Sequence, residues 1–187
     1  MTPNTSASRD DTQNALMAGH EAGPPVQFVT FTLGEEEYGV DIMRVREIRG
    51  WTPATVIPNA PAHMRGVINL RGVVVPIFDL RARFDMGMTN PSAKHVVIIV
   101  DVDSRTVGLL VDTVSDIITI SSATIKPVPD LSAQNKRSFL DGLVALDERM
   151  VALVSLDCLV RQEFAPGHQS EILPAASSEE ATAQTDA

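Results

Sequence analysis

The sequence predicts an all-β fold with minor helices, in which two small β-barrels pack together in one body. Two observations favour it: short β-branched runs alternate with turn residues over most of the chain, and an early stretch of these runs recurs later. The chain has 187 residues, of which 44% are apolar. A body of about 140 residues would bury roughly two-thirds of its unfolded surface, so neither disulfides nor metals are needed to hold it.

The composition divides the chain into one domain and two tails. Residues 1–25 and 166–187 are rich in Ala, Ser, Thr and acidic side chains without an apolar period. We expect both tails to be disordered, because they lack the apolar surface that offsets chain entropy. The domain is therefore expected at 26–165, with a first repeat at about 26–88 and a second at about 94–165.

Ten short segments have the β-branched and aromatic content of strands and are bounded by turn residues such as Gly34-Glu35-Glu36. In chain order they are Phe28–Leu33, Tyr38–Asp41, Val45–Arg49, Gly66–Leu70, Val73–Phe78, His95–Val100, Thr106–Val111, Val114–Ile120, Leu140–Leu146 and Met150–Val154.

Helices are expected at two places. Ser155 is a suitable cap for a segment that runs to Phe164, in which Leu156, Leu159 and Val160 have the spacing of one helix face. A shorter turn of helix is expected after Asp79, from Leu80 to Phe84.

An internal repeat in the sequence predicts how these strands are arranged. Aligning Gly39 with Gly108 places two blocks of the first half on blocks of the second half without a gap, and two further blocks match in the same order after an insertion around Asp130 to Ser138. The matched blocks are Val45, Glu47 and Ile48 with Val114, Asp116 and Ile117; 55–58 with 124–127; 66–70 with 142–146; and Asp79-Leu80 with a position near Asp157. The repeat predicts two copies of a barrel of roughly 60–70 residues, which would be marginal alone. The seam between two such barrels is a natural groove for a partner.

Charge and cysteine content exclude several classes of function. The formal net charge of −9 argues against nucleic acid, whose binding requires clustered Lys and Arg. The single cysteine, Cys158, cannot form an internal disulfide. No apolar run approaches the roughly 18 residues of a membrane span, and the first residues lack a basic region followed by an apolar one. We expect a cytoplasmic protein without direct membrane insertion.

Motifs of catalysis and cofactor binding are missing from the sequence. It contains no GxxxxGK[ST], GxGxxG, HExxH, CxxC or GxSxG, so we expect neither enzyme activity nor a cofactor. His63 and His95 could meet in space, but nothing in their spacing predicts a metal site. Asp101 and Asp103 are better explained as turn residues than as a carboxylate pair, and Cys158 as a small apolar residue than as a reactive thiol.

Arg71 and Glu47 are less easily explained. An exposed ion pair contributes only about 0 to 1 kcal/mol, so stability is a weak reason for either charge. Arginine is a frequent anchor in protein interfaces, because its planar fork binds carboxylates while its stem packs on apolar surface. The residues alone leave two interpretations open for Arg71: a docking residue or a solvated turn.

Three segments together closely resemble the CheW family of bacterial chemotaxis coupling proteins. They are FVTFTLGEEEYGVDIMRVREIRGW at 28–51, NLRGVVVPIFDLRARF at 69–84 and VGLLVDTVSDII at 107–118. The resemblance spans about 26–165 and follows the same order in both repeats.

The resemblance implies two five-stranded, SH3-like barrels around a shared core and no catalytic activity. It also implies two partners: the cytoplasmic hairpin tip of chemoreceptors and the regulatory domain of the histidine kinase CheA. These would be coupled in membrane-associated arrays, in which CheW-like modules can alternate in rings.

Matching the family's motifs to this sequence gives two expected surfaces. The receptor side is expected to include Val45, Glu47, Arg71 and Val114. The kinase side is expected to include Val74, Lys126, Asp130 and Leu131. For the apolar members, a place in the barrel core remains the alternative.

Two other functions remain as alternatives. The groove between the barrels could bind a small ligand. A hydrolase that depends on Asp79 or Asp112 is also conceivable, although both aspartates fall at strand ends, in positions that the repeat accounts for.

Overall fold

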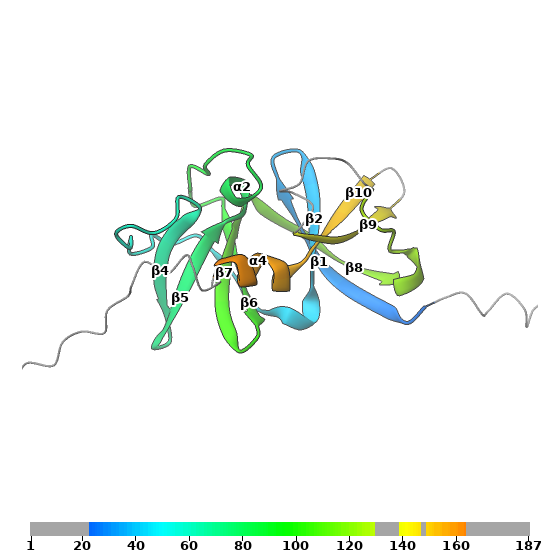
Figure 1. The fold of residues 1–187 in the computed structure, drawn as a ribbon, viewed down its shortest axis with the longest axis horizontal. Coiled ribbons are helices and arrows are strands. Elements are labelled where there is room, and N and C mark those ends of the chain that lie inside the picture. Colours follow the sequence, from blue (N-terminus) through cyan, green and yellow to red (C-terminus); the bar gives the residue numbers. More distant parts are fainter. Residues whose placement is uncertain (1–22, 130–138, 147–148, 164–187) are drawn as a thin grey trace, which may run out of the picture.

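A computed structural model describes residues 23–129, 139–146 and 149–163 of the chain. It contains all ten expected strands and both expected helices (Figure 1). The strands are β1 (Pro25–Leu33), β2 (Glu36–Asp41), β3 (Val45–Gly50), β4 (Met64–Leu70), β5 (Val73–Asp79), β6 (Val96–Val102), β7 (Arg105–Val111), β8 (Thr113–Ser121), β9 (Leu140–Leu146) and β10 (Arg149–Val154). The helices are α2 (Leu80–Arg83) and α4 (Leu156–Glu163), with 3-10 turns η1 (Ile42–Arg44) and η2 (Ser122–Thr124).

The strands form two five-stranded sheets, in the orders β8-β1-β2-β10-β9 and β3-β6-β7-β5-β4. Each sheet takes strands from both halves of the chain. Exchanging each strand for its counterpart in the other repeat, β1 for β6, β2 for β7 and so on to β5 for β10, converts one strand order into the other. Each sheet also contains one parallel pair, which is β2 with β10 in one and β5 with β7 in the other. The repeats are therefore equivalent in topology.

This exchange corrects the expectation that each repeat forms one barrel by itself. Each repeat gives its first two strands to one sheet and its last three to the other. The crossing occurs after β2 through η1, and after β7 through Asp112. Because the halves share sheets, backbone hydrogen bonds between them reinforce the apolar seam.

The two helices follow equivalent strands, but their repeat partners differ from those expected. Asp79 N donates to the carbonyl of His63 at 2.7 Å, and Ser155 N donates to the carbonyl of Phe139 at 2.7 Å. The structural counterpart of Asp79 is therefore Ser155, two residues before the expected Asp157. The Ser155 carbonyl accepts the first helical bond, from Leu159 N at 3.0 Å, as expected of the residue that caps α4.

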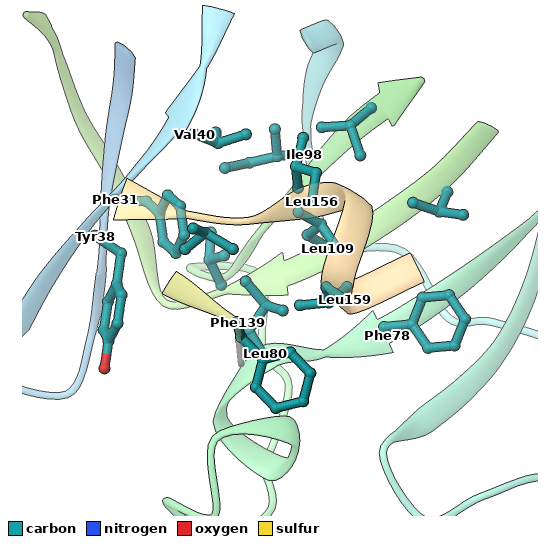
Figure 2. Packing of buried hydrophobic residues seen from close by; sticks show 14 of the residues in the cluster. Phe31, Tyr38, Val40, Phe78, Leu80, Ile98, Leu109, Phe139, Leu156 and Leu159 are labelled. Atoms are coloured by element: carbon teal, nitrogen blue, oxygen red, sulfur yellow. The ribbon is translucent and has the colours of Figure 1, made fainter. Parts of the chain in front are cut away.

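Buried side chains form a central cluster between the sheets and a smaller cluster within each barrel. Strand β1 contributes to two of them, because Val29, Phe31 and Leu33 face the central cluster while Val26 and Phe28 face a barrel interior. Figure 2 shows Phe31, Leu109 and Leu156 converging in the central cluster. The apolar face of α4 covers this cluster, as the spacing of its leucines predicted.

Glycine allows each barrel to close where its outer strands approach. Gly66 has φ +127, and a Cβ atom there would lie 2.2 Å from the carbonyl oxygen of Thr55, which bonds across the closure to Val67. The equivalent Gly142 lies beside Lys126, whose backbone bridges to Leu143. Within the described ranges, no helix combines the length and hydropathy of a transmembrane span.

Candidate functional site

The tip of the β4–β5 hairpin holds Arg71 in a conformation that is unusual for its residue type. Leu70 pairs with Val73, so Arg71 and Gly72 form a two-residue turn, with φ values of +54 and +90. Two positive φ angles define the type I′ turn, which favours Asn and Gly rather than arginine. Asn69 stabilises the turn, because its Oδ1 accepts a hydrogen bond from Gly72 N at 2.8 Å. The Arg71 side chain is 85% exposed.

The structure brings Arg71 to Glu47, although one lies in the β4–β5 turn and the other on β3. Arg71 Nη2 is 3.4 Å from Glu47 Oε2, and Arg49 Nη1 is 3.9 Å from Glu47 Oε1. The contact forms because barrel closure carries the end of the β4–β5 hairpin toward β3. One carboxylate thus faces two guanidinium groups, and the surface keeps an excess positive charge.

Arg49 was not singled out in the sequence. It follows Glu47 by two residues on β3, and alternate residues of a strand point to the same face. That spacing was the available signal in the sequence. Only the structure shows that Arg49 lies beside the same carboxylate as Arg71.

Val45 and Val114 have the same role at equivalent places in the two repeats. Both are partly buried and pack against the central cluster. Val45 pairs with Val100 on β6, and Val114 pairs with Phe31 on β1. Each contributes to the core while keeping some accessible surface, so their docking role stays a prediction.

Two expected kinase-side residues lie in the described part of the chain, on different barrels. Val74 is 65% exposed on β5, beside the exposed Val73 and near the turn that holds Arg71. Lys126 is exposed and lies at the closure of the other barrel, where its backbone exchanges two 2.8 Å hydrogen bonds with Leu143. The other two residues, Asp130 and Leu131, lie outside the described residues.

The aspartates considered for hydrolysis have structural partners. Asp79 is fully buried, and its carboxylate accepts hydrogen bonds from Ala82 N, Thr89 N and the Thr89 hydroxyl. Asp112 Oδ2 accepts from Gly34 N at 2.7 Å and from Arg81 at 3.1 Å. Asp112 thus connects the β1–β2 turn to α2 at a crossing between the sheets. Asp79 is not exposed to solvent, so a substrate could not reach it.

Asp101 and Asp103 also have ordinary partners. Asp101 binds Arg46 at 3.1 Å and accepts from Thr106 at 2.7 Å, while Asp103 lies in the β6–β7 turn with φ +47. The turn interpretation of these aspartates is therefore supported. Cys158 is exposed on α4. Among the residues that the structure describes, no group of three or more His, Cys, Asp or Glu side chains is arranged to hold a metal ion.

Comparison with known proteins gives one consistent family. Residues 27–164 match the model of the CheW-like domain. The chemotaxis protein CheW of Rhizobium meliloti is 51% identical over 137 residues, covering 73% of this chain and 88% of the relative. The probable chemotaxis protein CheW of Rhizobium etli is 50% identical over 133 residues, 71% of this chain and 86% of the relative.

A solved structure supports the same family. The crystal structure of the scaffolding protein TtCheW from Thermoanaerobacter tengcongensis superposes with a TM-score of 0.67 at 35% identity. The match covers 75% of this chain and 90% of that chain. The resemblance noted from the sequence is confirmed.

Proposed function

The chain belongs to the family of CheW-like domains, and on that premise we propose that it is a non-catalytic coupling protein of bacterial chemotaxis. In this role it joins the cytoplasmic hairpin tip of chemoreceptors to the regulatory domain of the histidine kinase CheA. It acts in the cytoplasm, at membrane-associated receptor arrays.

The observation that carries the receptor side is the conformation of Arg71. A non-glycine residue in a left-handed turn costs free energy, and such strain is tolerated most where the side chain has a function. The guanidinium is exposed and shares the Glu47 carboxylate with Arg49. It is thus available to a carboxylate or carbonyl of the receptor tip, and Val45 and Val114 are proposed to supply the apolar contact.

In this proposal the kinase side has a part on each barrel: Lys126 lies on the other barrel from Arg71, whereas Val74 follows Arg71 on the same hairpin. Lys126 is exposed at the closure of one barrel, and Val74 offers an apolar side chain on the other. Asp130 and Leu131, which follow Lys126 in the sequence, are proposed to complete the contact. A module with one kinase-facing surface on each barrel can bridge two CheW-like neighbours, as ring assembly requires.

Binding measurements with Arg71→Asn test the receptor side. Asn suits the type I′ turn, so the variant removes the charge without disturbing the backbone. We expect a receptor signalling fragment to bind at least about tenfold more weakly, as for loss of an interface arginine. Arg161→Asn is the matched control. Arg161 lies on α4 and is also an exposed arginine in an ion pair, which it forms with Asp103. Equal receptor affinity of Arg71→Asn and wild type would refute the assignment.

The kinase side needs its own measurement. Lys126→Glu should weaken binding of the CheA regulatory domain and leave receptor binding intact, whereas Arg71→Asn should do the reverse. If both variants lose both partners, the two surfaces are not separate.

A further inference from the structure

A groove opens between the two barrels beside the β1–β2 turn. It has a volume of about 630 Å³, and its floor is apolar and continuous with the central cluster. We call it the seam groove, and it is lined by Glu35, Glu36, Glu37, Tyr38, Phe84, Leu140, Arg149, Met150 and Ala152.

The groove lies where the two repeats differ. In the second repeat, α4 has eight residues, packs Leu159 and Val160 on the central cluster and reaches the β6–β7 turn, where Arg161 Nε is 3.8 Å from Asp103. In the first repeat, the equivalent helix α2 has four residues, ends at Arg83 and is capped by Phe84. Figure 1 shows the difference in length. The second turn of helix that covers one half of the seam is therefore lacking in the other half, beside the β1–β2 turn.

The rim of the groove is acidic. Glu37 pairs with Arg149 at 3.2 Å, and Glu36 accepts a hydrogen bond from the Tyr38 hydroxyl. Burial raises the pKa of Tyr38 above its ordinary value, and Glu36 raises it further, so the hydroxyl stays protonated and donates. Among the described residues, no Lys, Arg or His pairs with the carboxylates of Glu35 or Glu36. An occupant with positive charge would therefore be favoured.

The groove is distinct from the place of Val114, the proposed receptor-facing residue on the same sheet. Val114 pairs with Phe31, Phe31 with Tyr38, and Tyr38 with Ala152, so one row crosses four neighbouring strands. Three strand spacings, about 14 Å in total, separate Val114 from Ala152 in the floor of the groove.

We propose that the seam groove is a docking site for a helical segment of a partner protein that carries apolar side chains on one face and an Arg or Lys at its end. The second repeat provides the template, since α4 sets leucines on the seam and an arginine at the adjacent turn. The apolar floor receives the equivalent side chains, and Glu35 and Glu36 receive the cation. This surface adds a contact to those of the receptor and the kinase.

The test uses a helix-constrained, fluorescein-labelled peptide with Leu at positions i, i+3 and i+4 and two Arg in its last turn. We expect saturable binding to the full chain, measured by fluorescence polarisation. A peptide with Glu in place of both Arg should bind about tenfold more weakly or not at all, because the charge-assisted contacts are lost. The double variant Glu35→Lys, Met150→Ser should lose affinity for the arginine peptide by about the same factor.

Asp141→Lys, Ile117→Ser is the matched control, because it makes the same changes of charge and apolar surface at exposed positions of the same sheet. It should bind the peptide as wild type does. Lack of saturable binding, equal binding of both peptides, or equal loss in both double variants would overturn the proposal. The proposal would also be overturned if the wild-type chain self-associates in sedimentation and the double variant Glu35→Lys, Met150→Ser does not. A second copy of the chain would then be the occupant of the groove. Neither receptor nor kinase is present, so this result is independent of the coupling function.

Discussion

At the scale of single residues, Arg71 has a backbone conformation that its residue type does not favour. Its φ of +54 belongs to a turn for which Asn-Gly is the favoured sequence. The Arg71 to Glu47 contact offsets little of this cost, because an exposed ion pair contributes about 0 to 1 kcal/mol. The residue is therefore better explained by binding than by folding.

This explanation predicts the stability of Arg71→Asn. The free energy of unfolding should stay unchanged or rise by up to about 1 kcal/mol, because Asn tolerates the left-handed conformation better than arginine does. Denaturant titration measures it. A clear loss of stability would mean that Arg71 supports the fold itself.

Gly66 predicts the opposite behaviour. Any side chain there would meet the Thr55 carbonyl within 2.2 Å, in a backbone conformation with φ +127. Gly66→Ala should destabilise the fold by more than about 2 kcal/mol, since neither backbone segment can move without opening the barrel. Gly50→Ala is the control, because a Cβ atom at Gly50 has no neighbour within 4 Å. Similar melting temperatures for both variants would show that the closure is not rigid.

At the scale of elements, the sequence predicted the ten strands well, because apolar β-branched runs and turn residues mark them locally. It did not predict where each strand pairs. The repeat alignment matched equivalent strands but could not reveal that the crossings after β2 and β7 send later strands to the other sheet. Strand exchange depends on contacts between distant segments, which local pattern does not encode.

The candidate site shows the same limit. Glu47 and Arg71 were identified separately, and their contact at 3.4 Å followed only from barrel closure. The seam groove could not be read from the sequence, because it results from the difference in length between α2 and α4 after both are packed on one cluster. The expected counterpart of Asp79 was two residues late, because it allowed for a longer hairpin in the second repeat. In the structure the two hairpins are equally long, since His63 precedes Asp79 by the same number of residues as Phe139 precedes Ser155.

For α4, we expect a substitution to have a large effect on stability at one residue and a small effect at its neighbour. Leu159 is fully buried in the central cluster, whereas Cys158 is exposed. Leu159→Ala should cost about 2 to 5 kcal/mol of unfolding free energy, as for other buried leucines, and Cys158→Ala about 0.5 or less. Chemical denaturation compares the two; a small effect for Leu159→Ala would mean that α4 is not part of the cooperative core.

At the scale of the whole molecule, the exchanged strands make the two barrels one folding unit. A fragment of 26–88 would contain β1 and β2 without their neighbours β8 and β10. Such a fragment would leave strand edges and much of the central cluster exposed, so it should not fold alone.

Cooperativity of the intact chain follows from the same topology. Trp51, the single tryptophan, packs against the cluster inside one barrel, so its fluorescence reports on that barrel, whereas far-ultraviolet circular dichroism reports on both. The two signals should give coincident unfolding transitions. Two separated transitions would mean that the barrels unfold independently despite sharing strands.

We propose that this chain couples receptors to the kinase and that Arg71 is part of the contact. The most direct measurement reconstitutes a receptor signalling fragment and CheA on vesicles and follows kinase autophosphorylation without this protein, with it, and with its Arg71→Glu variant. We predict strong activation by the wild-type chain and its loss with a variant whose melting temperature is unchanged. Absence of activation by a folded, bound wild-type chain would contradict coupling, and full activation by Arg71→Glu would contradict the role of Arg71.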